Sequence, residues 1–195
     1  MTFADLKTAI ADYLANGSAT ASIPSFVRLA ESVIRRDVRV QAMESKATGA
    51  LASGVLTLPA GFVDARRLEV GGRVHDYVNA EQYAEMEDAG SQARVFTRVG
   101  NTIEVLNGGN GSYELLHYAA FPALSADSDT NWLLTNASDV YLFKSLMFAA
   151  VFLKDVEAAQ AYEGLYQGAK DAVNALENTN KYSGSALTMS IGGAV

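Results

Sequence analysis

Two pairs of carboxylates are the first candidates in this sequence for acid–base catalysis. Glu85 with Asp88, and Glu157 with Glu163, are acidic pairs that could in principle share the acid and base steps of glycoside hydrolysis. Acidic side chains are far more often solvated surface groups, and we favour that interpretation for both pairs. We therefore assign no catalytic residue from the sequence.

Metal ligation is the second chemistry to consider. Residues 127–131 place oxygen ligands at alternate positions, as the first half of a calcium loop does, but Trp132 replaces the required glycine and Ser138 replaces the bidentate glutamate. His75 and His117 are the only histidines, and they fall on separate predicted strands. The chain contains no cysteine. We expect neither a metal site nor a bound cofactor.

Charge and hydropathy exclude two further classes of protein. The net charge is −7, and the only obvious basic cluster is formed by Arg35, Arg36 and Arg39, which we interpret as a solvated or interface edge of a helix. The apolar run 140–153 is too short to cross a bilayer, and the N-terminus lacks the layout of a signal peptide. We expect a soluble product that neither contacts a membrane nor binds nucleic acid tightly.

Helical patterns occupy both ends of the chain. Apolar residues recur at steps of three and four in residues 3–14 and 26–38, and the second of these patterns begins just after Pro24. Residues 140–153 are apolar on almost every face, because Lys144 is their only charged residue. Asp155 is a natural N-cap, so we predict a break near Lys154 and a second, amphipathic helix after it.

The apolar helix needs cover on almost every side, and one neighbouring helix cannot supply it. The remainder must come from the N-terminal helices or from another copy of the chain. The residues that we predict at a contact between copies are Leu142, Phe143, Leu146, Met147, Tyr162 and Tyr166.

The middle of the chain has the period of strands. Gly71-Gly72 and Gly100-Asn101 are two-residue hairpin signals, and residues 112–120 form a further strand. Asn79 with Gln82 caps a short helix between the two hairpins. These signals predict an antiparallel β-lobe.

Together the patterns predict a mainly helical α+β fold. Two helical hairpins, residues 1–41 and 127–181, pack as a bundle, and residues 42–126 form the inserted β-lobe. Residues 182–195 are small, polar and rich in glycine, so they form an extended C-terminal tail that cannot build a core. We expect a partner to order this tail, although packing on its own subunit is the alternative. The predicted anchors are Tyr182, Leu187, Met189 and Ile191.

Six stretches resemble one known family when they are taken in order. They are residues 1–14, 23–39, 56–62, 130–134, 152–155 and 182–189. Over almost the whole chain, their order and spacing resemble the adaptor, or head-to-tail connector, proteins of tailed bacteriophages, of the tail accessory factor type. Asn136 and Ala137 depart from that pattern, where a charged residue and a proline are expected before the helix.

The resemblance implies a non-enzymatic protein of the virion neck, made in the host cytoplasm, whose copies form a ring, a dodecamer that matches the portal. The tail would bind the portal protein and the β-lobe would face a tail or nozzle protein. Double-stranded DNA would pass transiently and without sequence specificity, and an excess of carboxylates would keep its phosphates from binding. Two alternatives stay open: a virion-associated cell-wall hydrolase, or another tail-completion or stopper protein.

Overall fold

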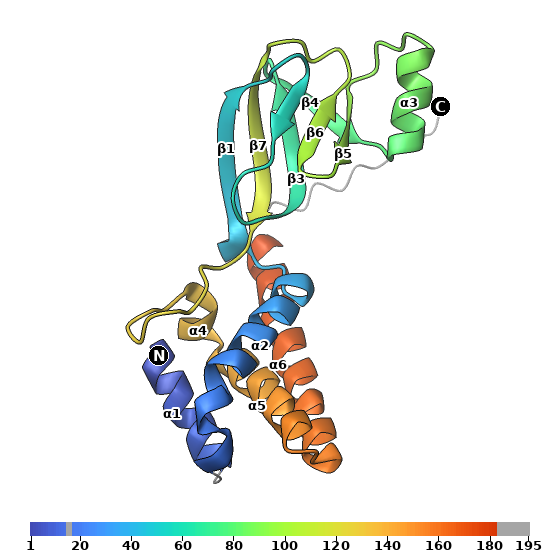
Figure 1. Ribbon diagram of the computed structural model, residues 1–195. Coiled ribbons are helices and arrows are strands. Elements are labelled where there is room, and N and C mark those ends of the chain that lie inside the picture. The colour runs from blue at the N-terminus through green and yellow to red at the C-terminus, as the bar shows by residue number, and fades with distance from the viewer. Residues whose placement is uncertain (15–16, 183–195) are drawn as a thin grey trace, which may run out of the picture.

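Helices gather at one end of the molecule and a curled sheet stands at the other (Figure 1). The computed structural model describes residues 1–14 and 17–182, and within them the side chains of residue 18 and of residues 176–182 are not described. Two chain crossings, after residue 37 and after residue 119, join the helices to the sheet.

The helical end contains five α-helices and two short 3-10 turns within the described residues. The turns are Gly17–Ser22 and Gln41–Met43, and the helices are α1 (Phe3–Leu14), α2 (Ile23–Asp37), α4 (Trp132–Asn136), α5 (Ser138–Phe152) and α6 (Val156–Tyr182).

Short polar side chains begin several of these helices, because a helix leaves its first N–H groups without partners. The Thr2 N–H donates to the Asp5 carboxylate (2.8 Å) at the start of α1. The predicted cap at Asp155 is confirmed, since its Oδ1 accepts a hydrogen bond from the Ala158 N–H (3.0 Å).

Helix α5 lies at the centre of the helical end. It contacts α6, α2, α1 and α4, and Val140 and Leu146 are fully buried among them. The Tyr141 hydroxyl accepts a hydrogen bond from the Asn131 side chain (2.9 Å), which links α5 to the start of α4. Burial raises the pKa of Tyr141 to about 12. Four neighbours in the same chain thus cover most of the apolar helix.

The sheet contains seven strands within the described part of the chain, in the order β1-β7-β3-β4-β5-β6-β2. The strands are β1 (Glu44–Ala50), β2 (Val55–Thr57), β3 (Phe62–Val70), β4 (Arg73–Tyr77), β5 (Val95–Val99), β6 (Thr102–Val105) and β7 (Ser112–Ala119). The predicted hairpins at Gly71-Gly72 and Gly100-Asn101 are confirmed, because Val70 pairs with Arg73 and Val99 with Thr102.

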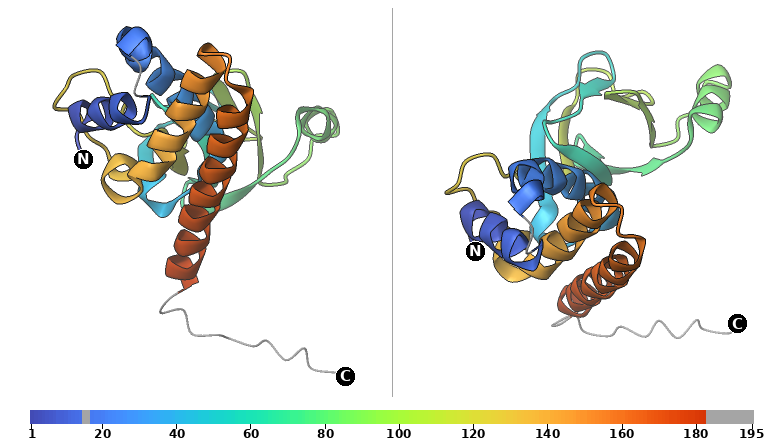
Figure 2. Two further views of the ribbon diagram at one scale, coloured as in Figure 1. Left: turned by 90° about the horizontal axis from the view of Figure 1, so that it is seen from below. Right: turned by 60° about the horizontal axis from the view of Figure 1, so that its bottom comes forward.

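Connection length forces this sheet to curl. Strands β1 and β2 lie at opposite edges of the sheet, yet only residues 51–54 connect them. In a flat sheet of this size the edges would stand about 29 Å apart, whereas so short a connection spans about 17 Å at most. Two register irregularities bend β3, and the result is the nearly closed barrel of Figure 2. Leu68, Ile103 and Leu115 are fully buried in its interior cluster.

The predicted architecture, a mainly helical bundle with an inserted antiparallel β-lobe, is wrong. The sheet is a major part of the molecule, and it is mixed, because β4 and β5 run parallel. Parallel neighbours need a long crossover connection, and helix α3 (Ala80–Asp88) is part of that crossover. The capping signal at Asn79 located α3 correctly, but a capped helix between two hairpins does not reveal that it connects parallel strands.

Truncation of Leu146 should show how far the core depends on α5. We expect Leu146→Ala to lower the free energy of unfolding by about 2–5 kcal/mol, because the side chain is fully buried and would leave a cavity. Leu142→Ala, at a half-buried position of the same helix, should cost less than about 2 kcal/mol. Urea unfolding of the two variants at low protein concentration measures both; equal losses would contradict the central position of α5.

Candidate functional site

An apolar groove lies where α5 turns into α6, at the free end of the helices (Figure 1). Its volume is about 500 Å³. The residues that line this α5–α6 groove are Lys144, Met147, Val151, Lys154, Val156, Ala159, Gln160 and Glu163. Apolar side chains form its walls and charged groups stand around them, which is the composition of a protein contact.

Large apolar side chains are exposed on and beside the groove. Val151 is 58% exposed and Val156 is 68% exposed. Phe152 is 56% exposed although its ring contacts Phe26 of α2, with ring centroids 5.5 Å apart. Leu29 of α2 is exposed as well. Such a set at one end of a molecule indicates a surface that another protein covers.

A buried ion pair forms one wall of the groove. Lys144 is the single charged residue of the apolar part of α5; it is 6% exposed, and its ammonium group lies 2.6 Å from the Glu163 carboxylate of α6. The same ammonium lies 4.5 Å from the ring centroid of Tyr166. The Tyr166 hydroxyl donates in turn to Asp37 of α2 (2.9 Å). Three helices are thus joined through one lysine.

The ionisation of this network follows from burial and charge. Burial on its own raises the pKa of Glu163, but hydrogen bonds from Lys144 and Gln167 and the charges of Lys144 and Lys170 outweigh it, so that the pKa is lowered. Burial raises the pKa of Tyr166, and its hydrogen bond to Asp37 raises it further. Glu163 is therefore an anion and Tyr166 a neutral donor over the physiological range.

The residues predicted at a contact between copies fall into two groups. Leu146 and Tyr166 are fully buried inside a single chain. Leu142, Phe143, Met147 and Tyr162 are half-buried, and Met147 lines the groove. Of the predicted residues that are not fully buried, Met147 therefore lies in the groove together with Val151 and Val156, two residues that the sequence pattern did not single out.

The predicted anchors of the C-terminal tail lie beyond what the structure describes. Tyr182 is the last residue of α6, and its side chain is not described. Leu187, Met189 and Ile191 lie outside the described residues.

The carboxylates considered for hydrolysis are either exposed or have a lowered pKa. Glu85 and Asp88 lie exposed on α3. Glu157 is exposed near the start of α6, and Glu163 has a lowered pKa, whereas a general acid needs a raised one. The loop that resembles a calcium site has an internal role, because the Asp129 carboxylate accepts hydrogen bonds from the Ser125 and Ala126 N–H groups (2.8 and 2.7 Å).

The histidines and arginines considered earlier have internal partners. His117 is buried and stacks on Phe62, and His75 bonds to the Arg73 carbonyl through Nδ1 (2.9 Å). Arg35 donates to the Phe62 carbonyl (3.1 Å), which links α2 to β3.

No group of three or more potential metal ligands occurs among the described residues. None of the described helices combines the length and the apolar character that a bilayer span requires.

An apolar groove is thus open at one end of the molecule, and a curled sheet stands at the other. A family model described as SU10 adaptor protein matches residues 1–189, and the chain belongs to this family. It is a structural adaptor protein of a bacteriophage. No curated protein is similar enough to the chain to be matched.

The sequence predicts only part of the α5–α6 groove. A lone lysine in an apolar helix is a signal for a buried ion pair, because an unpaired buried charge is costly. Its partner, however, is on the next helix, 19 positions away, and nothing local identifies Glu163 among the acidic residues of α6.

The Lys144–Glu163 pair makes stability depend on pH. The pKa of Glu163 is lowered in the folded chain, so its contribution is full above its ordinary value of 4.5 and is lost as the pH falls through the lowered value. Glu163→Gln should flatten the pH dependence of the free energy of unfolding below pH 4.5, and should cost about 1–2 kcal/mol at pH 7, since Glu163 is partly solvated.

The matched control replaces both charges. Lys144→Met combined with Glu163→Gln should recover most of the stability, because no buried ammonium is then left unpaired. Chemical denaturation between pH 3 and pH 8 measures all three chains. Equal stability of the single and the double variant would show that the pair has no role in the fold.

Proposed function

We propose that the α5–α6 groove is the contact through which copies of this adaptor protein close into a ring. The observation that carries the proposal is the exposure of Val151 and Val156 in one apolar groove, with Phe152 exposed next to it in the sequence. In a heterologous contact, a groove on one copy binds a different surface on the next copy. Such contacts form a closed ring when the rotation between neighbouring copies divides a full turn evenly.

The ring fits the position of an adaptor. We propose that it is a dodecamer in the virion neck, matched to the portal, and that the C-terminal tail with Tyr182, Leu187, Met189 and Ile191 binds the portal protein. The curled sheet, at the opposite end from the groove, then faces the tail or nozzle protein. Membership of the adaptor family supports both partners.

Passage of DNA through the ring suits the charge of the chain. The net charge is −7, and the Arg35 and Arg39 guanidiniums bond to carbonyls of the chain itself. A channel that holds few free cations gives double-stranded DNA little to bind, so that phosphates move past without specific contacts.

Charges placed in the groove should prevent assembly and leave the fold intact. We expect Val151→Lys with Val156→Lys to remain monomeric at concentrations at which the unmodified chain forms rings, because both positions are exposed in the single chain. Val74→Lys, at an exposed position of β4, is the matched control and should still assemble. Light scattering with negative-stain images measures the outcome; rings formed by the groove variant would refute this contact.

Removal of residues 183–195 separates ring formation from portal binding. The truncated chain keeps every described element, so its thermal unfolding and its ring should be unchanged. Its co-sedimentation with isolated portal protein should be lost, because three of the four proposed anchors, Leu187, Met189 and Ile191, are gone. Undiminished portal binding by the truncated ring would refute the assignment of the tail while leaving the groove untouched.

A further inference from the structure

A second hollow, of about 260 Å³, lies between α3 and the loops at the far end of the sheet. Its floor is formed by the loop between β1 and β2 and the loop between β6 and β7, and α3 with its following loop closes one side. The residues that line it are Ser53, Gly54, Val55, Tyr83, Glu87, Gly90, Ser91, Glu104, Val105, Leu106, Asn107, Gly108 and Gly109. We call it the acidic pocket, because Glu87 and Glu104 are its charged groups.

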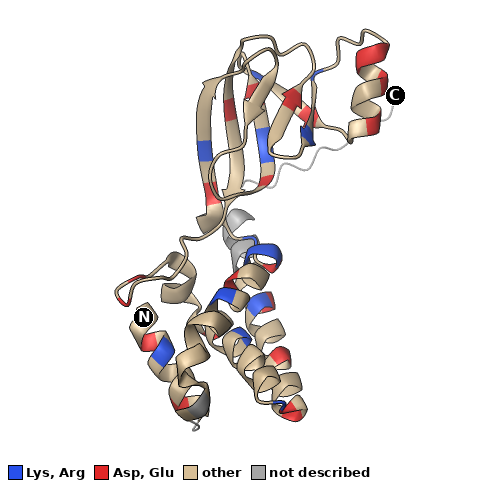
Figure 3. Cartoon of the chain, in the orientation of Figure 1, with Lys and Arg blue, Asp and Glu red and all other residues tan. Residues whose placement is uncertain are grey.

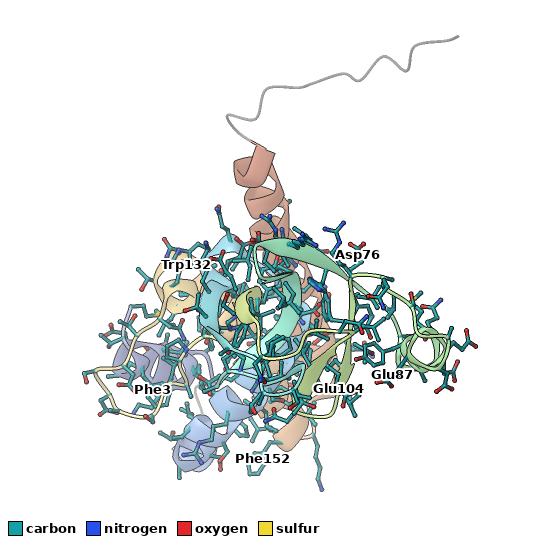
Figure 4. The ribbon with its side chains drawn as sticks, turned by 90° about the horizontal axis from the view of Figure 1, so that it is seen from above. Phe3, Asp76, Glu87, Glu104, Trp132 and Phe152 are labelled. Atoms are coloured by element: carbon teal, nitrogen blue, oxygen red, sulfur yellow. The ribbon has the colours of Figure 1, made fainter. Side chains whose placement is uncertain are left out.

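The two carboxylates reach the acidic pocket from different elements. Glu87 belongs to α3 and Glu104 to β6, and Figure 4 shows both on the side of the sheet near α3. Figure 3 shows that α3 carries acidic residues and no basic one. Among the ion pairs of the described residues, none uses Glu87 or Glu104. Both negative charges are available to a ligand.

A buried phenol lies between these charges. Tyr83 lines the acidic pocket and is only 7% exposed, yet within residues 1–14 and 17–182 no hydrogen bond to its hydroxyl is found. Burial raises the pKa of Tyr83, and the charges of Glu87 and Glu104 raise it further. Among the described side chains, the hydroxyls that are buried without any partner are those of Thr97 and Ser145. The Tyr83 hydroxyl is not one of them, so it stays in contact with water at the acidic pocket, where a ligand group is able to replace that water.

The walls of the acidic pocket are held in place before any ligand arrives. The Asn107 side chain donates to the Ser91 carbonyl (2.8 Å), which ties the loop after α3 to the loop after β6. The Val105 N–H donates to the Gly54 carbonyl (2.8 Å). At Gly108 a Cβ would stand 2.8 Å from Leu51, so this close approach of the loop requires glycine. A preformed site binds without an ordering cost.

We propose that the acidic pocket binds the guanidinium group of an arginine side chain from a protein partner at this end of the molecule. A guanidinium offers five N–H donors in a planar fork, enough to meet two carboxylates and a phenol oxygen that approach from different elements. A metal ion is a poorer occupant, because no cluster of three or more potential ligands occurs in the described part of the chain.

The neighbouring hollow limits which segment can bind. Arg73 and Arg94 line a hollow that shares Leu106 and Asn107 with the acidic pocket. A partner segment with several adjacent basic residues would place positive charges next to Arg73 and Arg94. A segment with a single arginine flanked by neutral or acidic residues would not. The partner is therefore a segment with one isolated basic side chain.

Nuclear magnetic resonance of the full chain tests this site directly. The probe is N-acetyl-arginine methylamide, and N-acetyl-citrulline methylamide is its uncharged isostere, both titrated at constant ionic strength. We expect the arginine probe to shift the amide signals of Gly54, Ser91, Asn107 and Gly109 in a saturable way, and the citrulline probe to leave them unchanged.

Variants assign the binding to the pocket. Glu87→Gln with Glu104→Gln should raise the dissociation constant about tenfold or more, and Tyr83→Phe about threefold. The control, Glu85→Gln with Asp88→Asn, also removes two negative charges, both from α3 and both outside the pocket. It should change the dissociation constant less than about twofold. Signal dispersion in the same spectra reports folding of each variant.

Two results would overturn the proposal. One is a shift of equal size with the citrulline probe, and the other is unchanged binding in Glu87→Gln with Glu104→Gln while that variant stays folded. Both readouts come from the single chain, so they are independent of whether the α5–α6 groove forms a ring.

Discussion

The structure depends on the need to cover one helix on nearly every side. Helix α5 has no polar face, and four helices of the same chain pack around it. The one charge in its apolar part, Lys144, pairs with Glu163 and lies over the ring of Tyr166. The cover ends where α5 turns into α6, and this is where apolar groups remain exposed. The unfinished burial of α5 and the contact surface that we propose between copies are therefore the same feature.

Local signals in the sequence located most elements correctly. Caps at Asp5, Asn79 and Asp155, and the turn pairs Gly71-Gly72 and Gly100-Asn101, act through hydrogen bonds and backbone angles within a few residues. These interactions are the same in any tertiary context. They predict where an element begins and ends. The resemblance to the adaptor proteins rested on other evidence, the order and spacing of six stretches of sequence.

Such local signals do not predict contacts between residues that are far apart in the sequence. The parallel pairing of β4 with β5, the closure of the sheet between β1 and β2, and the ion pair between Lys144 and Glu163 each join residues that no local pattern connects. The same limit applies to the groove, because Leu146 and Met147 are adjacent apolar residues in the sequence, and only the arrangement of α1, α2 and α6 buries one of them completely.

The way in which the sheet is attached has a mechanical consequence. The chain enters it through β1 and leaves it through β7, and these two strands pair with each other from Glu44 opposite Tyr118 onwards. A force that pulls the helices away from the sheet therefore acts on two adjacent strands at the same end, and the load passes into the sheet through the hydrogen bonds between β1 and β7 and those between β7 and β3. Neither strand is peeled from the other, so the attachment suits a part that transmits tension between larger bodies.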